Sequence, residues 1–167
     1  MTGTTDTAPY RDASRPTAER VDDLLGRMTI EEKVAQLTGT LPFDLLGPNG
    51  LSRPLMEEHL SAGLGEISAG GLLSPDPASL ISALSAIQRF LVEETRLGIP
   101  AIVHQEALAG VVHAACQDFP TALNLGASWD PESVEAMNDI VRRQMRALGL
   151  HQACSPNLDI ARDARWG

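Results

Sequence analysis

The stretch Gly98-Ile-Pro-Ala-Ile-Val-His-Gln-Glu106 decides the fold of this chain. Its central run, Pro100 to Val103, is short and apolar and predicts a buried strand that leads into three polar residues. A helix is predicted on each side of this strand. Asp76-Pro77 and Asp130-Pro131 each place an N-cap carboxylate before a proline of the first turn, which is typical of helix starts. Apolar stripes follow both starts: Leu80, Leu84, Ile87 and Leu91 after the first, and Val134, Met137, Val141 and Leu148 after the second.

Further strands are predicted at residues 63–67 and 151–160. Strands that alternate with helices at this spacing are typical of a parallel sheet built from βαβ units. Such a sheet belongs either to an open doubly wound fold or to a (β/α)8 barrel, and periodicity alone does not choose between them. Three parallel strands leave edges uncovered, and a barrel takes about 250 residues, so we expect this chain to be part of a larger domain.

The first third of the chain has weaker signals. Residues 1–15 lack periodicity and are expected to form a flexible tail or a strap on the surface. A helix is predicted from Pro16, and a second begins at the capping box Thr29–Glu32. Residues 40–54 are rich in proline and glycine and predict a loop, followed by a short helix over 55–62. The residues expected to point inward from the first two helices are Val21, Leu24, Leu25, Met28, Val34 and Leu37.

Composition excludes some classes of function. The net charge is −9 and the pI is near 4.8, so we expect no nucleic-acid partner. The apolar runs are much shorter than the roughly 20 residues that span a bilayer, so we expect no membrane partner. Cys116 and Cys154 form neither a disulfide framework nor a zinc set and are expected to be buried free thiols. With no secretory signal at the start, these cysteines favour a cytoplasmic location, and no metal or cofactor is expected.

Polar residues follow the predicted strands, where ligands bind in both candidate folds. Glu106 could bind hydroxyls, act as an acid or base, or cap a turn. His104 is expected to be a hydrogen-bonded histidine near the end of the sheet. The Asp- and Arg-rich run after the third strand could be a structural charge network or could hold sugar hydroxyls, with Trp166 against a sugar ring. The residues of that run are Asn157, Asp159, Arg162, Asp163 and Arg165.

Four stretches of this chain resemble glycoside hydrolase family 3, in order and at matching separations. They begin at Arg20 (RVDDLLGRMTIEEKVAQL), Arg96 (RLGIPAIVHQEALAG), Phe119 (FPTALNLGASWDP) and Ser155 (SPNLDIARDARWG). Together they cover the chain from about Thr17 to Gly167. The sequence departs from the family at Ala109, where many members have His, and at Ala164, where Pro is usual.

The resemblance implies that residues 16–167 form the first three βα units of a (β/α)8 barrel. It implies a retaining enzyme that removes a sugar from the non-reducing end of a β-glucoside or β-xyloside. The family's nucleophile and acid/base lie beyond this chain, so no catalytic residue is expected here and the remainder of the polypeptide is the expected partner. Glu106 matches the residue that binds sugar hydroxyls. Arg162, Asp163, Arg165 and Trp166 are expected to shape the loop near the sugar. The alternative is a noncatalytic barrel remnant that binds sugars or acts as an interaction module.

Overall fold

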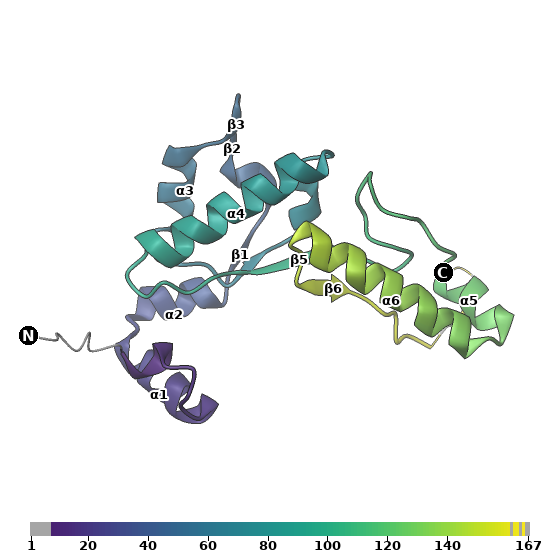
Figure 1. Cartoon of the computed structure of the whole chain (residues 1–167), viewed down its shortest axis with the longest axis horizontal. Coiled ribbons are helices and arrows are strands. Elements are labelled where there is room, and N and C mark those ends of the chain that lie inside the picture. Colours follow the sequence, from purple (N-terminus) through teal and green to yellow (C-terminus); the bar gives the residue numbers. More distant parts are fainter. Residues whose placement is uncertain (1–7, 161, 164, 166–167) are drawn as a thin grey trace, which may run out of the picture.

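The computed structural model of the protein describes residues 8–160, 162, 163 and 165. Its centre is a parallel sheet in the order β1 (Gly39–Thr40), β4 (Glu66–Ile67), β5 (Ile102–Glu106) and β6 (Gln152–Cys154). Figure 1 labels three of these strands, β1, β5 and β6. The parallel α/β architecture predicted from the sequence is confirmed. The strand count was wrong, because β1 has only two residues and lies where the proline- and glycine-rich composition predicted a loop.

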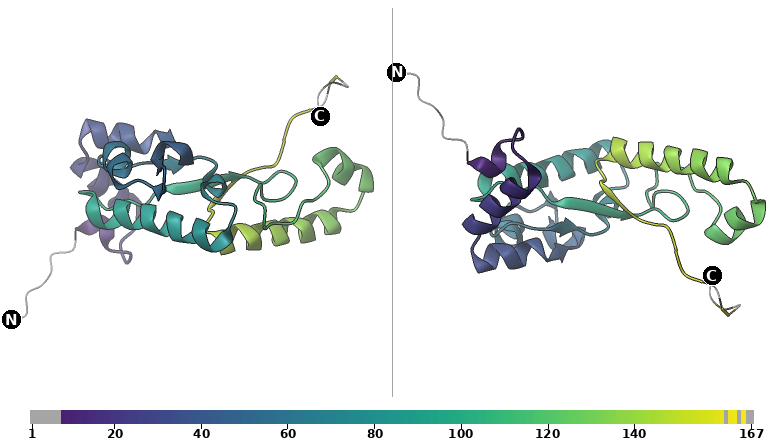
Figure 2. Two further views of the ribbon diagram at one scale, coloured as in Figure 1. Left: turned by 90° about the horizontal axis from the view of Figure 1, so that it is seen from above. Right: turned by 90° about the horizontal axis from the view of Figure 1, so that it is seen from below.

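The order of the strands distinguishes the two candidate folds. Each new strand of the sheet adds to the same side of the preceding one. A doubly wound sheet instead reverses direction and carries helices on both faces. The two long crossover helices, α4 (Pro77–Glu94) and α6 (Pro131–Leu148), lie on the same side of β5 (Figure 2). A single winding direction with helices on one face is the arrangement of an α/β barrel.

Helices α4 and α6 form for the reasons that the sequence predicted. The Asp76 carboxylate accepts a hydrogen bond from the Ser79 amide at 2.8 Å, and Asp130 accepts one from the Ser133 amide at 3.0 Å. Gly149 ends α6 with φ 79°, a left-handed conformation that costs glycine little. The predicted stripe of α4 is fully buried, and that of α6 is buried except for Val134, which is half-buried.

The core lies between these helices and the sheet. Ile67 and Val103 are fully buried and pack with the apolar faces of α4 and α6. Close packing continues at Gly70, where a Cβ atom would lie 2.3 Å from Val103 Cγ1. Only a residue without a side chain fits there, so the segment after β4 can pass directly across β5. Within the described residues no helix is both long and apolar enough to cross a membrane.

The N-terminal helices form as predicted but pack differently. They are α1 (Thr17–Arg27) and α2 (Ile30–Gln36), and the capping box joins Thr29 and Glu32 through both predicted hydrogen bonds, at 2.9 and 3.2 Å. The prediction that their apolar stripes point inward was wrong, because neither helix buries a residue and Leu37 is 88% exposed. Leu24 and Met28 are half-buried, whereas the other four residues of the predicted stripe stay exposed: Val21, Leu25, Val34 and Leu37.

Residues 8–15 are tied to the rest of the chain. Pro9–Arg11 form the short 3-10 helix η1. The Tyr10 hydroxyl donates to the Leu97 carbonyl at 2.8 Å, and the Tyr10 amide donates to the Asp23 carboxylate at 3.1 Å. This part of the expected tail is therefore a strap laid across the surface, whereas residues 1–7 lie outside the described residues.

The remaining elements are short connections. The predicted loop after β1 contains a 3-10 helix, η2 (Pro42–Leu45), and a small antiparallel hairpin of β2 (Leu46–Gly47) and β3 (Gly50–Leu51). Helix α3 (Arg53–Leu60) follows it, and the 3-10 helix η3 (Gly70–Leu73) follows β4. Helix α5 (Ala122–Ser128) precedes α6. The predicted strand over 151–160 is confirmed only for the three residues of β6.

Candidate functional site

Alternation along β5 separates two groups of side chains. Val103 and Gln105 are buried, whereas Ile102 and Glu106 are exposed and His104 is half-buried. The neighbouring strands add residues to the side of the sheet that carries His104 and Glu106. The register of β4 with β5 places Ser68, the residue after β4, next to His104. Strand β6 pairs Cys154 with Glu106. The polar sheet face is the name used below for Glu66, Ser68, His104, Glu106 and Cys154. It gathers residues from three strands at their carboxyl ends, where ligands bind in α/β folds.

Gln105 lies on the opposite, buried side of β5 and hydrogen-bonds to the backbone of two neighbouring segments. Its side chain is 1% exposed, its Oε1 accepts from the Gly71 amide at 2.8 Å, and its Nε2 donates to the Val112 carbonyl at 2.9 Å. One amide group thus joins β5 to η3 and to the segment that follows β5. Sequence reasoning missed this role, since a single glutamine in an apolar strand carries no specific signal.

His104 lies between two carboxylates. Its Nδ1 is 3.0 Å from Glu66 Oε1, and its Nε2 is 4.0 Å from Glu106 Oε1. Glu66 is itself held by Ser68, whose hydroxyl donates to the same Oε1 at 2.9 Å. Both ring nitrogens of His104 are buried, and neither makes a hydrogen bond of regular geometry to any described residue. The prediction of a fully hydrogen-bonded histidine was therefore wrong, because the nearest acceptors approach the ring at unsuitable angles or too far away.

Glu106 ends β5 with its side chain 57% exposed. Cys154 lies beside it, and the prediction that both cysteines are buried was wrong, since Cys154 is exposed and Cys116 half-buried. Loss of water around the sulfur, followed by the negative charge of Glu106, raises the pKa of the Cys154 thiol. The thiol is therefore protonated at neutral pH and can donate to the Glu106 carboxylate, most of which faces solvent.

The Asp- and Arg-rich run forms a local ion pair. Arg165 donates to both carboxylate oxygens of Asp163 at 2.8 Å, and its amide donates at 3.0 Å. These bonds lower the pKa of Asp163 to about 2. Arg162 lines a shallow hollow with Asp159, Ile160 and Asp163. The segment after β6 extends away from the sheet (Figure 2), and Trp166 lies outside the described residues.

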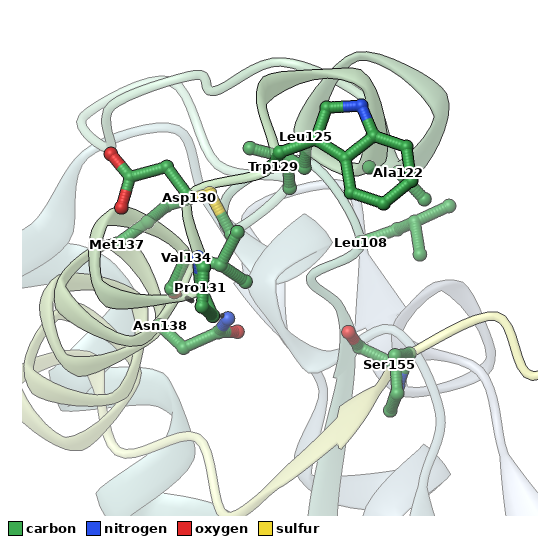
Figure 3. A pocket seen from close by; sticks show the side chains of 12 residues that line it. Leu108, Ala122, Leu125, Trp129, Asp130, Pro131, Val134, Met137, Asn138 and Ser155 are labelled. Atoms are coloured by element: carbon green, nitrogen blue, oxygen red, sulfur yellow. Dashed lines mark hydrogen bonds between the residues drawn. The ribbon is translucent and has the colours of Figure 1, made fainter.

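A larger apolar hollow of about 460 Å³ opens between α5, α6 and the ends of β5 and β6 (Figure 3). Two of its polar side chains are already used: Asp130 caps α6 and Asn138 donates to the Val134 carbonyl at 2.8 Å. Sugars require several free hydrogen-bonding groups, so the polar sheet face is the better candidate for a sugar site.

Comparison with known proteins agrees with this architecture. The model of the glycosyl hydrolase family 3 N-terminal domain matches residues 29–167. A putative beta-xylosidase of Formosa agariphila is 34% identical over 98% of this chain and 22% of its own length. A periplasmic beta-glucosidase/beta-xylosidase of Dickeya chrysanthemi is 31% identical over 95% and 26%, and a probable beta-glucosidase C of Aspergillus flavus is 32% identical over 96% and 27%.

The chain thus spans about a quarter of the length of these relatives. The match runs from the second helix through all four parallel strands and includes every residue of the polar sheet face. Family, sheet order and helix placement agree, and the chain belongs to glycosyl hydrolase family 3 through its N-terminal domain.

Proposed function

We propose that this chain supplies part of the sugar-binding subsite of a retaining β-glycosidase that acts at the non-reducing end of β-glucosides or β-xylosides. The observation that carries the proposal is the position of Glu106, an exposed carboxylate at the carboxyl end of β5 in a family 3 domain. The names of the similar proteins, beta-xylosidase and beta-glucosidase, support this class of substrate.

In this proposal the two oxygens of Glu106 accept hydrogen bonds from neighbouring sugar hydroxyls. A carboxylate suits this task, because hydrogen bonds to an ionised acceptor are stronger than those between neutral groups. In this proposal Arg162, Asp163 and Arg165 shape the loop that follows β6, where an ion pair joins the last two side chains.

Retaining hydrolysis needs two further carboxyl groups about 5–5.5 Å apart, one as nucleophile and one as acid and base. We place both in the remainder of the polypeptide. Glu106 is left out of the chemical step because its closest ionisable neighbours are a histidine and a thiol. Its role is to hold the sugar ring so that the anomeric carbon meets the nucleophile.

The test pairs binding with turnover. Ligand-detected NMR with methyl β-xyloside and methyl β-glucoside measures binding to the purified protein, and release of nitrophenol from the matching nitrophenyl glycosides measures turnover. Glu106→Gln is expected to weaken binding at least about tenfold, because a bond to a charged acceptor contributes roughly 1.5–3 kcal/mol. Glu93→Gln, on the exposed face of α4, is the matched control.

The outcomes separate the candidate functions. Binding without turnover, lost in Glu106→Gln, is the result that the proposal expects of this chain, because both catalytic carboxyl groups are placed outside it. Turnover by this chain alone would contradict that placement, and a longer polypeptide that binds sugar without turnover would support the sugar-binding module instead. Equal binding by Glu106→Gln and the wild-type protein would remove Glu106 from the subsite and refute the proposal.

A further inference from the structure

Three side chains of the polar sheet face have the composition of a metal site. One ligand atom each from His104, Glu106 and Cys154 lies within 4.8 Å of the other two. Imidazole nitrogen, carboxylate oxygen and thiolate sulfur are the three ligand types that zinc takes in proteins. The set comes from two adjacent strands, because His104 and Glu106 face the same side of β5 and Cys154 pairs with Glu106 across the sheet.

We propose that His104, Glu106 and Cys154 bind one Zn²⁺ ion, with a fourth position left open to water. Three protein ligands and an open position are a common arrangement for zinc. In a tetrahedral site of ordinary bond lengths, ligand atoms lie about 3.3–3.7 Å apart, so the present separations must contract by up to about 1.5 Å. Glu106 and Cys154 are exposed and can make this adjustment through side-chain rotation.

The strongest support comes from His104. Both of its ring nitrogens are buried without a regular hydrogen bond to a described residue, which is a costly state for a polar group. A metal bound to Nε2 satisfies that nitrogen. Nδ1 already lies 3.0 Å from Glu66 Oε1, and metal-binding histidines almost always donate their other N–H to a carboxylate.

Glu66 and Ser68 complete the outer part of the site. The Ser68 hydroxyl donates to Glu66 Oε1. A rotation of the His104 ring or of Glu66 would turn the 3.0 Å approach of Nδ1 to that oxygen into a hydrogen bond, and the carboxylate would then hold the tautomer that leaves Nε2 free to bind the ion. When zinc binds, the Cys154 S–H bond breaks, the sulfur forms a bond to the ion and the proton passes to solvent. The charges of Glu106 and the thiolate then balance those of Zn²⁺.

The test is a titration of the tag-free protein with Co²⁺, which takes zinc sites and is coloured. We expect one equivalent to give visible bands and a near-ultraviolet charge-transfer band from thiolate to cobalt, and Zn²⁺ to remove both. Cys154→Ser is expected to abolish the charge-transfer band, and His104→Ala to weaken binding further than Glu66→Gln. For Glu66→Gln a loss of about 10–100-fold is expected, since it removes only the outer support.

Cys116→Ser is the matched control, because Cys116 is the other thiol and lies in the connection after β5. It should keep the full spectrum and affinity. A wild-type protein without the charge-transfer band would overturn the proposal, and so would a band that survives Cys154→Ser or disappears in Cys116→Ser. The titration contains no sugar, so its result is independent of the proposed glycosidase function, although Glu106 belongs to both sites.

Discussion

The side-chain amide of Gln105 is expected to stabilise the fold strongly, and Gln105→Met tests this. Methionine has a similar length and volume, so the substitution keeps the packing and removes two hydrogen bonds, to the Gly71 amide and the Val112 carbonyl. The Gly71 amide is buried, and a buried donor without a partner costs about 1–3 kcal/mol. Val112 is half exposed, so its carbonyl regains water and loses only about 0.5–1.5 kcal/mol.

The sum predicts that Gln105→Met lowers the free energy of unfolding by roughly 1.5–4.5 kcal/mol. Urea unfolding followed by far-ultraviolet circular dichroism measures this value, and hydrogen exchange of the Gly71 amide should accelerate in parallel. Gln117→Met is the matched control, because that exposed side chain donates only to the carbonyl of Asp118. A Gln105→Met protein within about 0.5 kcal/mol of wild type would refute the reasoning, since that is the effect of an ordinary surface change.

Three further predictions test the fold. Gly65→Ala should disrupt the pairing of β1 with β4, because the new Cβ would lie 2.2 Å from the Gln36 carbonyl oxygen. In Gly26→Ala the new Cβ meets nothing within 4 Å, so this change in α1 should stabilise the folded protein by up to about 1 kcal/mol. Thermal melts compare the two variants. Hydrogen bonds from Ser133 lower the pKa of Asp130 in the folded protein. The contribution of Asp130 to the free energy of unfolding is therefore fully present above about pH 4 and is lost as the pH falls through the folded-state pKa. In urea titrations at pH 2–5, Asp130→Asn should lose less stability on acidification than the wild-type protein. Leu37→Gln should change the unfolding free energy by less than about 0.5 kcal/mol, because Leu37 is exposed; a loss above about 2 kcal/mol in urea unfolding would show that another surface covers it.

Local signals predicted the long helices well. The starts of α4 and α6 depend on an Asp-Pro pair and a nearby serine amide, all within four residues, so the sequence contains the whole cause. Their apolar stripes are buried because each crosses the sheet. The same kind of stripe on α1 and α2 is exposed, since burial depends on a covering partner that periodicity cannot supply.

Tertiary contacts explain what the sequence could not predict. Strand β1 has two residues, too few for alternation to be visible, and its pairing with β4 depends on a glycine that allows close approach. The polar sheet face was only half predicted. Glu106 and His104 follow a recognisable strand, but Cys154 joins them through the parallel register of β6, and Glu66 joins through β4. These pairs lie 38 and 48 positions apart in the sequence, and the strand pairing of the folded sheet brings them together.

Glu106 takes part in both proposals, and this gives a last prediction. Its carboxylate oxygens cannot bind Zn²⁺ and sugar hydroxyls at full strength together, because both ligands use the same lone pairs. Zn²⁺ should therefore act as a competitor: the apparent Kd for methyl β-xyloside should rise in proportion to one plus the ratio of free zinc to the zinc dissociation constant. Cys154→Ser should remove most of the rise in apparent Kd with zinc, whereas Cys116→Ser should behave like wild type. NMR titration of the sugar at several fixed zinc concentrations measures the effect. If the cobalt spectrum shows that the protein binds the metal but the apparent Kd for the sugar does not change with zinc, Glu106 does not bind both ligands.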